Sequence, residues 1–377
     1  MKRILILAGR YLPGFKDGGP VRTLVNLTES FGDKYAFSIA CADRDHGDTE
    51  SYPDITPGRA NRVGKADVYY IREGRFDKKT IKELSDKADI LYVCGPYNGY
   101  AYLSMQMKKR GLISPPLVIA PMGSFSKGAL GIKKGKKLAY LKLIRLLGYF
   151  KNVIWSASSE AEKSEIKSIA GNDARVFVAE DLPSRPIVIK RTGIKAKNSL
   201  RVVFLSRISR KKNLSYALRI LNRDWDGDIS FDIYGVIEDK EYFSECMRLK
   251  DELKGRVSCR YMGEAAPDRV GEIFSGYDIF LFPTLGENFG HVVFEAMAAG
   301  CVPLISDTTI WRDLNERSAG FVVPLKDEDG FTEKLRLCMK MGADEFTKLS
   351  DFAMRYAGER YEESLRNSGY REIFDRL

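Results

Sequence analysis

Two glutamates on either side of a glycine turn, Glu287 and Glu295, have the setting that best suits chemistry on a bound ligand. A buried strand is predicted to end at Phe282, and the next helix is predicted to begin near Gly290 and to end at Gly300. The unpaired N–H groups at such a helix start attract anions, and a diphosphate suits a loop at the carboxyl end of a strand in an open α/β sheet. Glu287 precedes the helix and Glu295 lies inside it. We therefore expect them to bind different hydroxyls of one extended ligand rather than to form one catalytic dyad.

The elements that would position this loop alternate between short apolar runs and longer amphipathic stretches, which is typical of βαβ units with parallel sheets. The alternation occurs twice, and it fails between residues 181 and 199, where two prolines interrupt it. The predicted strands are residues 3–8, 35–40, 68–71, 90–93, 117–120, 153–156, 200–205, 229–234, 257–261, 279–282 and 302–306. The predicted helices include residues 18–31, 135–150, 213–221, 241–254, 269–274 and 290–299.

A chain of 377 residues is long enough for two such domains. We predict a first Rossmann-like domain over residues 1–186 and a second over residues 187–355. Residues 356–377 are predicted to form a C-terminal helix that either caps the second domain or crosses back onto the first.

The segment that begins at Glu287 reads Glu-x-Phe-Gly, four residues, Glu-Ala, two residues, Ala-Gly, two residues, Pro. This pattern resembles the Glu-x7-Glu signature of glycosyltransferase family 4, whose members are retaining enzymes of the GT-B fold. The resemblance implies an α/β protein in which two Rossmann-like domains face each other, parallel sheet to parallel sheet, across a cleft. It also implies a hexosyltransferase that moves a sugar from a UDP- or GDP-linked donor to a glycan or lipid-linked acceptor in surface polysaccharide synthesis.

Members of this family place an Arg and a Lys after the first strand of the second domain, where they neutralise the diphosphate of the donor. Arg207 and Lys212 fit in type and spacing, although Ser206 stands where the family often has Gly. Arg can grip phosphate oxygens with two hydrogen bonds and Lys supplies a point charge. Read without the resemblance, the same basic cluster also fits a solvated helix start. The resemblance assigns the catalytic roles to Arg207, Lys212 and Glu287.

The resemblance also indicates which residues contact the donor. In the first domain, Gly18 and Gly19 belong to a loop that would line the donor phosphate and the acceptor side, where the absence of a Cβ allows close approach. A Gly-Gly pair is also common in ordinary turns. In the second domain, the donor-binding positions are Tyr261, Met262, Asn288, Phe289, Gly290, His291 and Glu295, with Tyr261 and Met262 beside the nucleotide base.

The acceptor side is expected in two loops of the first domain, which contain Asp43 with His46 and Met122 with Gly123. Many relatives have Arg or His at the position of Met122, so no side-chain role is carried over to it. Trp155, Ser158 and Glu160 also match the family, but a core tryptophan and a helix N-cap explain them equally well.

The mechanism that the resemblance implies is a front-face one, in which the leaving diphosphate takes the proton of the acceptor hydroxyl. The sequence offers no clear nucleophile. We expect no metal and no cofactor besides the nucleotide-sugar, because His46 and His291 are the only histidines and the nearest Asp-x-Asp triplet, Asp43–Asp45, lies in the first domain.

Charge is distributed unevenly over the chain, whose formal net charge is +10. Between residues 90 and 159 there is no acidic residue, and such a basic field attracts nucleic acid, anionic lipid or a phosphorylated substrate. A helix over residues 135–150 would lie on an anionic membrane surface or, equally well, pack on its own sheet with solvated lysines. Scattered cysteines without a Cys-x-x-Cys pair indicate a cytoplasmic protein, free or peripheral on the cytoplasmic face of the membrane.

Three rival functions stay open from the sequence. A nucleotide-sugar epimerase and a sugar phosphorylase use the same fold, and an epimerase needs no acceptor. A basic nucleic-acid-binding protein would show a steep dependence of affinity on salt, but it leaves the Glu287–Glu295 pattern unexplained, so we expect no nucleic-acid partner.

Overall fold

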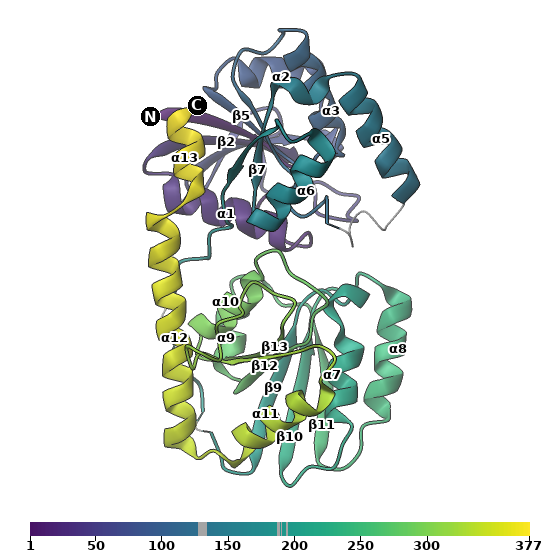
Figure 1. The fold of residues 1–377 in the computed structure, drawn as a ribbon, viewed down its shortest axis with the longest axis vertical. Helices are drawn as coiled ribbons and strands as arrows, with labels where there is room; N and C mark the ends of the chain where they lie inside the picture. Colours follow the sequence, from purple (N-terminus) through teal and green to yellow (C-terminus); the bar gives the residue numbers. More distant parts are fainter. Residues whose placement is uncertain (127–133, 187–188, 190, 194) are drawn as a thin grey trace. The chain divides into compact units, whose positions relative to one another are not determined.

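The computed structural model describes residues 1–126, 134–186, 189, 191–193 and 195–377 (Figure 1). The chain divides into two compact units, which we describe separately. Unit 1 comprises Met1–Leu182 and Ser364–Leu377, and unit 2 comprises Pro183–Glu363. The predicted limits at residues 186 and 355 therefore differ from these boundaries, because residue 355 falls inside a continuous helix, α12 (Ala343–Arg366).

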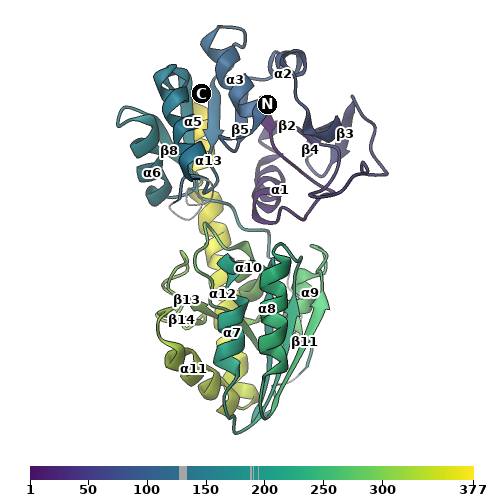
Figure 2. The same ribbon diagram turned by 90° about the vertical axis from the view of Figure 1, so that its right-hand side faces the viewer.

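Unit 1 contains an eight-stranded sheet in the order β3-β4-β2-β1-β5-β6-β7-β8. Every neighbouring pair is parallel except β3 and β4, which are antiparallel and lie at one edge of the sheet (Figure 2). The sequence prediction missed β3 and β8, which are edge strands of four residues each and are partly exposed. The strands are β1 (Lys2–Leu7), β2 (Tyr35–Ala42), β3 (Ala60–Val63), β4 (Ala66–Ile71), β5 (Ile90–Cys94), β6 (Leu117–Ala120), β7 (Val153–Ala157) and β8 (Arg175–Val178).

Both faces of this sheet are covered by helices, so most strands are apolar along their whole length. One face packs against α1 (Gly19–Phe31) and α13 (Gly369–Arg376), with Leu27 and Phe374 in the core. The other face packs against helices that include Met105 and Ile144 in their buried sides. These helices are α2 (Lys78–Ser85), α3 (Gly99–Lys109), α5 (Lys134–Leu146) and α6 (Glu160–Ala170), and short 3-10 turns lie at Arg72–Gly74 and Tyr149–Asn152.

Helix α5 is shorter than the predicted helix over residues 135–150. It ends at Leu146, and Gly148 then adopts the left-handed conformation with φ 69° before the 3-10 turn at Tyr149–Asn152. Glycine enters this region without the steric cost that a Cβ imposes.

Unit 2 contains a six-stranded, fully parallel sheet in the order β11-β10-β9-β12-β13-β14. The prediction missed only β14, a three-residue edge strand. The strands are β9 (Ser199–Leu205), β10 (Asp228–Tyr234), β11 (Val257–Gly263), β12 (Ile279–Phe282), β13 (Val302–Ser306) and β14 (Phe321–Val323). The helices are α7 (Leu214–Leu221), α8 (Lys240–Asp251), α9 (Val270–Ser275), α10 (His291–Ala298), α11 (Glu328–Lys340) and α12, with a 3-10 turn, η3, at Arg210–Lys212.

Helix α12 starts in unit 2, and its last three residues belong to unit 1 (Figure 1). The chain then continues into α13, whose Tyr370, Ile373 and Phe374 are buried in the core of unit 1. Among the described residues, no helix combines the length and the apolar character that crossing a membrane requires.

Candidate functional site

The sheet of unit 2 changes direction of winding between β9 and β12, which are neighbours in the sheet although they are distant in sequence. After β9 the chain proceeds to β10 on one side, and after β12 it proceeds to β13 on the other side. The loops that follow these two strands therefore diverge from a common point at the carboxyl edge. In open α/β sheets this switch point is where ligands bind.

Lys212 and Glu287, which lie in these two loops, form a buried ion pair. The Lys212 ammonium Nζ donates to Glu287 Oε1 at 2.7 Å and to Oε2 at 2.8 Å. Their side chains are only 11% and 10% exposed, so the charges depend on each other rather than on water. Burial lowers the pKa of the Lys212 ammonium, and the Glu287 carboxylate opposes that shift. The structure thus brings together two residues that the sequence assigned to one site.

Arg207 lies nearby but has a different environment. Its guanidinium forms an ion pair with Glu238 at 2.9 Å, and the two side chains are 38% and 48% exposed. Burial is the main cause of the lowered pKa of the Lys212 ammonium, and the Arg207 charge adds to it. Arg207 is therefore a solvent-accessible cation beside a buried one, and an incoming phosphate group could compete with Glu238 for it.

The loop that carries Glu287 is fixed by residues that the sequence prediction did not select. The Thr284 hydroxyl donates to Glu287 Oε1 at 2.9 Å, and the Thr284 carbonyl accepts from Ser306 Oγ at 2.6 Å and from Thr308 Oγ1 at 2.7 Å. Asn213 Nδ2 donates to the Pro283 carbonyl at 2.9 Å. The sequence signal that could have identified these residues is the presence of hydroxyl and amide side chains directly after adjacent parallel strands. Their hydrogen-bond partners, however, depend on the tertiary fold.

The start of α10 lies directly after this loop. Gly290 is the N-cap residue and adopts the left-handed conformation with φ 80° and ψ 55°, which glycine adopts most readily. The Phe289 carbonyl accepts from Trp311 Nε1 at 2.6 Å, and the Phe289 and Trp311 ring centroids are 5.3 Å apart. The first amides of a helix have no acceptor within the helix itself, so this anchored turn can present N–H groups to a phosphate.

The remaining predicted residues of this loop take different positions around the turn. Asn288 is exposed, while His291 and Glu295 are partly exposed on α10. The ring of His291 lies 4.8 Å from that of Phe289. The sequence placed Glu287 before the helix and Glu295 within it, and the structure has this arrangement, with Glu287 engaged by Lys212.

Tyr261 and Met262 lie at the carboxyl end of β11, which is the edge strand two positions from β9. The Tyr261 hydroxyl donates to the Gly235 carbonyl at 2.8 Å, and its ring packs 4.9 Å from that of Phe243. Its side chain therefore holds the loop after β10. Met262, in contrast, is 43% exposed and is free to contact a ligand.

In unit 1 the corresponding switch point lies between β1 and β5. The loop after β1 ends at Gly18, which has φ 67° and forms the N-cap of α1. A Cβ at Gly19 would meet no atom within 4 Å, so the fold itself does not require glycine there. Asp45, which the sequence prediction did not select, ties this loop to the loop after β2, because its carboxylate accepts from the amides of Phe15 at 2.8 Å and Lys16 at 3.2 Å.

Asp43 and His46 occupy different settings in the loop after β2. Asp43 is buried and accepts from Arg44 Nε at 2.9 Å and from the Glu73 amide at 2.9 Å. The hydrogen bond from Arg44 lowers the pKa of the Asp43 carboxyl. Asp43 is therefore engaged within unit 1, whereas the exposed His46 ring pairs with Asp17 at 2.9 Å.

Met122 and Gly123 form a turn with positive φ values of 53° and 79°. A buried carboxylate holds this turn, because Glu162 Oε1 accepts from the Gly123 amide at 2.6 Å. Glu162 Oε2 accepts from the amide and the hydroxyl of Ser158 at 2.7 and 2.8 Å. Of the neighbouring residues that matched the family, Trp155 is fully buried in the core, and Glu160 pairs with Lys163 at the start of α6.

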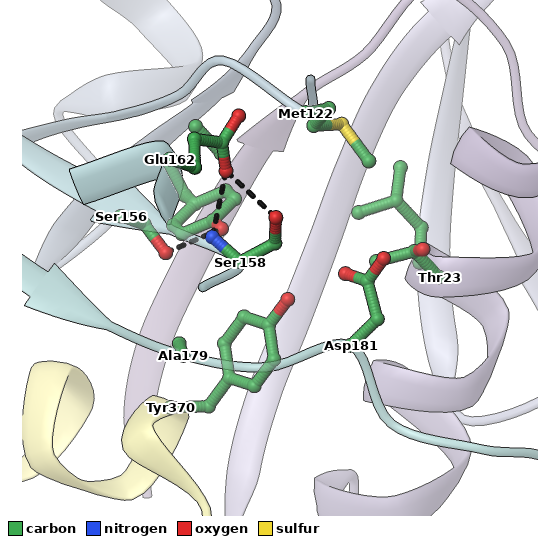
Figure 3. A pocket seen from close by; sticks show the side chains of 11 residues that line it. Thr23, Met122, Ser156, Ser158, Glu162, Ala179, Asp181 and Tyr370 are labelled. Atoms are coloured by element: carbon green, nitrogen blue, oxygen red, sulfur yellow. Dashed lines mark hydrogen bonds between the residues drawn. The ribbon is translucent and has the colours of Figure 1, made fainter. Parts of the chain in front are cut away.

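A small pocket opens beside this turn (Figure 3). Glu162 and Ser158 line one side, and Asp181, Thr23 and Tyr370 lie on the other. Its internal space of about 10 Å³ suits a single water or one hydroxyl group. Burial, with a contribution from the Glu162 charge, raises the pKa of Asp181 to about 7. Sequence reasoning missed Glu162, Asp181 and Tyr370, because the pocket assembles from helices and strands far apart in the chain.

Potential metal ligands do not gather in the described parts of either unit, where no three His, Cys, Asp or Glu side chains are grouped as a metal site would need. The chemistry that the described geometry supports is binding of a phosphate-bearing ligand at the switch point of unit 2.

Comparison with known proteins relates parts of this chain to glycosyltransferases. Residues 188–354 match the family model described as Glycosyl transferases group 1. The chain is 26% identical over 197 residues to glycogen synthase 1 of Synechocystis sp., covering 48% of this chain and 41% of that protein. It is 33% identical over 93 residues to phosphatidyl-myo-inositol mannosyltransferase of Mycolicibacterium smegmatis, covering 23% and 24%. The chain thus spans less than half the length of these relatives.

The fold resembles solved structures over the whole chain. HepE from Anabaena, determined with UDP and glucose, has a TM-score of 0.70 at 14% identity and is covered completely, as is this chain. The two parallel-sheet units and these structural neighbours show that the protein has the GT-B fold.

Proposed function

We propose that this protein is a glycosyltransferase that transfers a sugar from a nucleotide-sugar to a glycan or lipid-linked acceptor, with retention of anomeric configuration and without a metal ion. The observation that carries the proposal is the buried Lys212–Glu287 pair at the switch point of unit 2, beside the amide-bearing start of α10. It lies within the residues that match the Glycosyl transferases group 1 family.

In the proposed reaction, the donor diphosphate binds beside Lys212, Arg207 and the first amides of α10. Lys212 and the amides are fixed before the ligand arrives, and Arg207 exchanges Glu238 for the phosphate. Such preorganised positive charge stabilises the diphosphate as the sugar–oxygen bond breaks. Glu287 holds the Lys212 ammonium in place and positions the sugar. The leaving diphosphate accepts the proton of the acceptor hydroxyl, so the reaction needs no carboxylate base.

The donor side is supported by the chemistry of the structural neighbour HepE, which was determined with UDP-glucose. Met262, exposed at the end of β11, and Tyr261 beside it are proposed to contact the nucleotide base. On the acceptor side, a glucan and a phosphatidylinositol are the acceptor classes that the names of the two relatives suggest. We propose that unit 1 binds the acceptor near the Met122–Gly123 turn and His46. We further propose that the enzyme works in the cytoplasm, in the synthesis of a surface polysaccharide.

A calorimetric panel of UDP, GDP, ADP and their sugars tests the proposal. We expect one nucleoside diphosphate and its sugar to bind, and Lys212→Met to abolish that binding. Product analysis by NMR then separates transfer from epimerisation, because an epimerase converts the donor when no acceptor is present. Absence of binding across the whole panel would remove the proposed function.

A further inference from the structure

The outer face of α5, together with the residues at the end of α3, carries exposed leucines among basic residues. Leu143, Leu146 and Leu147 are 53%, 85% and 41% exposed, although soluble proteins rarely leave neighbouring leucines this accessible. Leu141 and Ile144 on the opposite side of α5 are buried in the core of unit 1. Helix α5 therefore already packs against unit 1 through its buried side, and the outward leucines have no role in that packing.

The end of α3 joins this face. The Lys109 ammonium donates to the Leu147 carbonyl at 2.6 Å and lies 5.1 Å from the Tyr149 ring centroid. Leu112 follows three residues after Lys109 and is 45% exposed. Figure 1 shows α3 and α5 together on the same side of unit 1. We call this surface the leucine face and define it by Leu112, Leu143, Leu146 and Leu147.

Only positive charge accompanies the leucine face in the sequence that forms it. Residues 90–159 contain no Asp or Glu, and acidic residues enter only with α6 and the turn after it. Lys127 and Lys133 of this segment lie outside the described residues. The exposed basic residues that accompany the leucine face are Lys109, Arg110, Lys136, Lys142, Arg145 and Lys151.

We propose that the leucine face binds the surface of an anionic lipid bilayer. Leucines with basic side chains around them match the two layers of such a surface, because the apolar groups enter the acyl boundary and the cations contact lipid phosphates. A nucleic acid would use the cations but leave the leucines in water. A second copy of the same face would bring the exposed lysines of α3 and α5 against one another. The charge pattern therefore favours lipid over both of these partners.

Flotation with phosphatidylcholine vesicles, with and without phosphatidylserine, tests the proposal on the full chain. We expect the protein to float with the anionic vesicles and to be released by high salt. The double variant Lys136→Gln/Lys142→Gln removes two exposed charges, and each is expected to weaken partition about fivefold. The double variant Leu143→Ser/Leu146→Ser is expected to weaken it by about tenfold for each leucine.

Matched controls are available in unit 2. Leu337 and Phe352 are 46% and 40% exposed, so Leu337→Ser/Phe352→Ser replaces two exposed apolar side chains by serine elsewhere. Lys254 and Lys340 are exposed lysines for a matching charge control. Equal flotation of the leucine-face variants and these controls would overturn the proposal. Failure of the protein to float with anionic vesicles would also overturn the proposal, whether or not the same residues mediate self-association or nucleic-acid binding. The experiment uses neither donor nor acceptor, so its failure leaves the proposed transfer reaction unaffected.

Discussion

The Lys212–Glu287 pair should contribute more to stability than a surface ion pair does. A double-mutant cycle can separate this contribution from the role of the pair in sugar transfer. Glu287→Gln keeps the shape of the side chain but leaves the Lys212 ammonium without its counter-charge. Lys212→Met keeps the volume of the stem but leaves the carboxylate with Thr284 alone as a side-chain donor among the hydrogen bonds described. The double variant removes both charges and leaves neither one unpaired.

The size of the effect follows from the burial of the pair. Side chains 11% and 10% exposed with contacts of 2.7 and 2.8 Å receive little screening from water. Breaking such a pair by removing one partner typically costs about 3–5 kcal/mol, because an uncompensated charge stays in the interior. Replacing both partners by neutral groups of similar volume is often close to neutral. We therefore expect each single variant to lose about 3–5 kcal/mol and the double variant to lose about 1 kcal/mol.

Calorimetric unfolding of the full chain measures these differences, and transfer assays on the same variants measure function. The double variant should fold nearly as well as the wild type and still turn over about 10²- to 10³-fold more slowly, because the preorganised ammonium is gone. Glu287→Gln unfolding at the wild-type temperature would contradict the buried pair. Wild-type turnover by the double variant would contradict its role in transfer.

Three further predictions concern separate features. Arg207→Ala should change the free energy of unfolding by about 1 kcal/mol or less, because the pair that Arg207 forms with Glu238 is solvent-exposed. Turnover should nevertheless fall about 10²- to 10³-fold, and unchanged turnover would remove Arg207 from the site. Burial raises the pKa of Asp181 to about 7, so the folded protein holds a proton that the unfolded chain releases and wild-type stability should fall as pH rises from about 4 to about 7. Asp181→Asn should remove this dependence and gain about 2–4 kcal/mol over the wild type by pH 8, and identical pH profiles of denaturation would refute the argument. Transfer activity should persist in excess chelator, and loss of activity that Mn²⁺ restores would show that a metal takes part.

The sequence was sufficient to predict that the loops after β9 and β12 lie together, because each loop directly follows a recognisable buried strand. Glu287, Gly290 and the residues after β9 follow strand ends, and parallel strands bring their carboxyl ends to one edge. A pattern read along the chain therefore indicated which loops meet. It did not indicate that Lys212 would be buried against Glu287 while Arg207 stays half-exposed beside Glu238, because that depends on which side chain the loop encloses.

The pocket beside the Met122–Gly123 turn could not be predicted in the same way. Glu162 stands three residues after the N-cap Ser159, a spacing typical of a capping box, but its carboxylate binds the Gly123 amide and Ser158 instead. Asp43 looked like a ligand-facing residue, and its partners Arg44 and Glu73 became visible only with the loops folded. The sequence prediction missed the edge strands β3, β8 and β14, which are only three or four residues long and are partly exposed.

The return of the chain into unit 1 has a consequence for how the protein is made on the ribosome. The Phe374 ring packs 5.2 Å from Tyr35 and 6.0 Å from Phe37, on a face of the sheet that is synthesised early. Helix α13 emerges only after all of unit 2 has been translated. Until then, only α1 covers this aromatic surface and the part of the core that α13 fills stays open, whereas unit 2 has its strands and helices α7 to α11 in one uninterrupted stretch. The later half of the polypeptide can therefore finish folding before the earlier half, and a nascent chain stalled before residue 369 should engage chaperones through its first half.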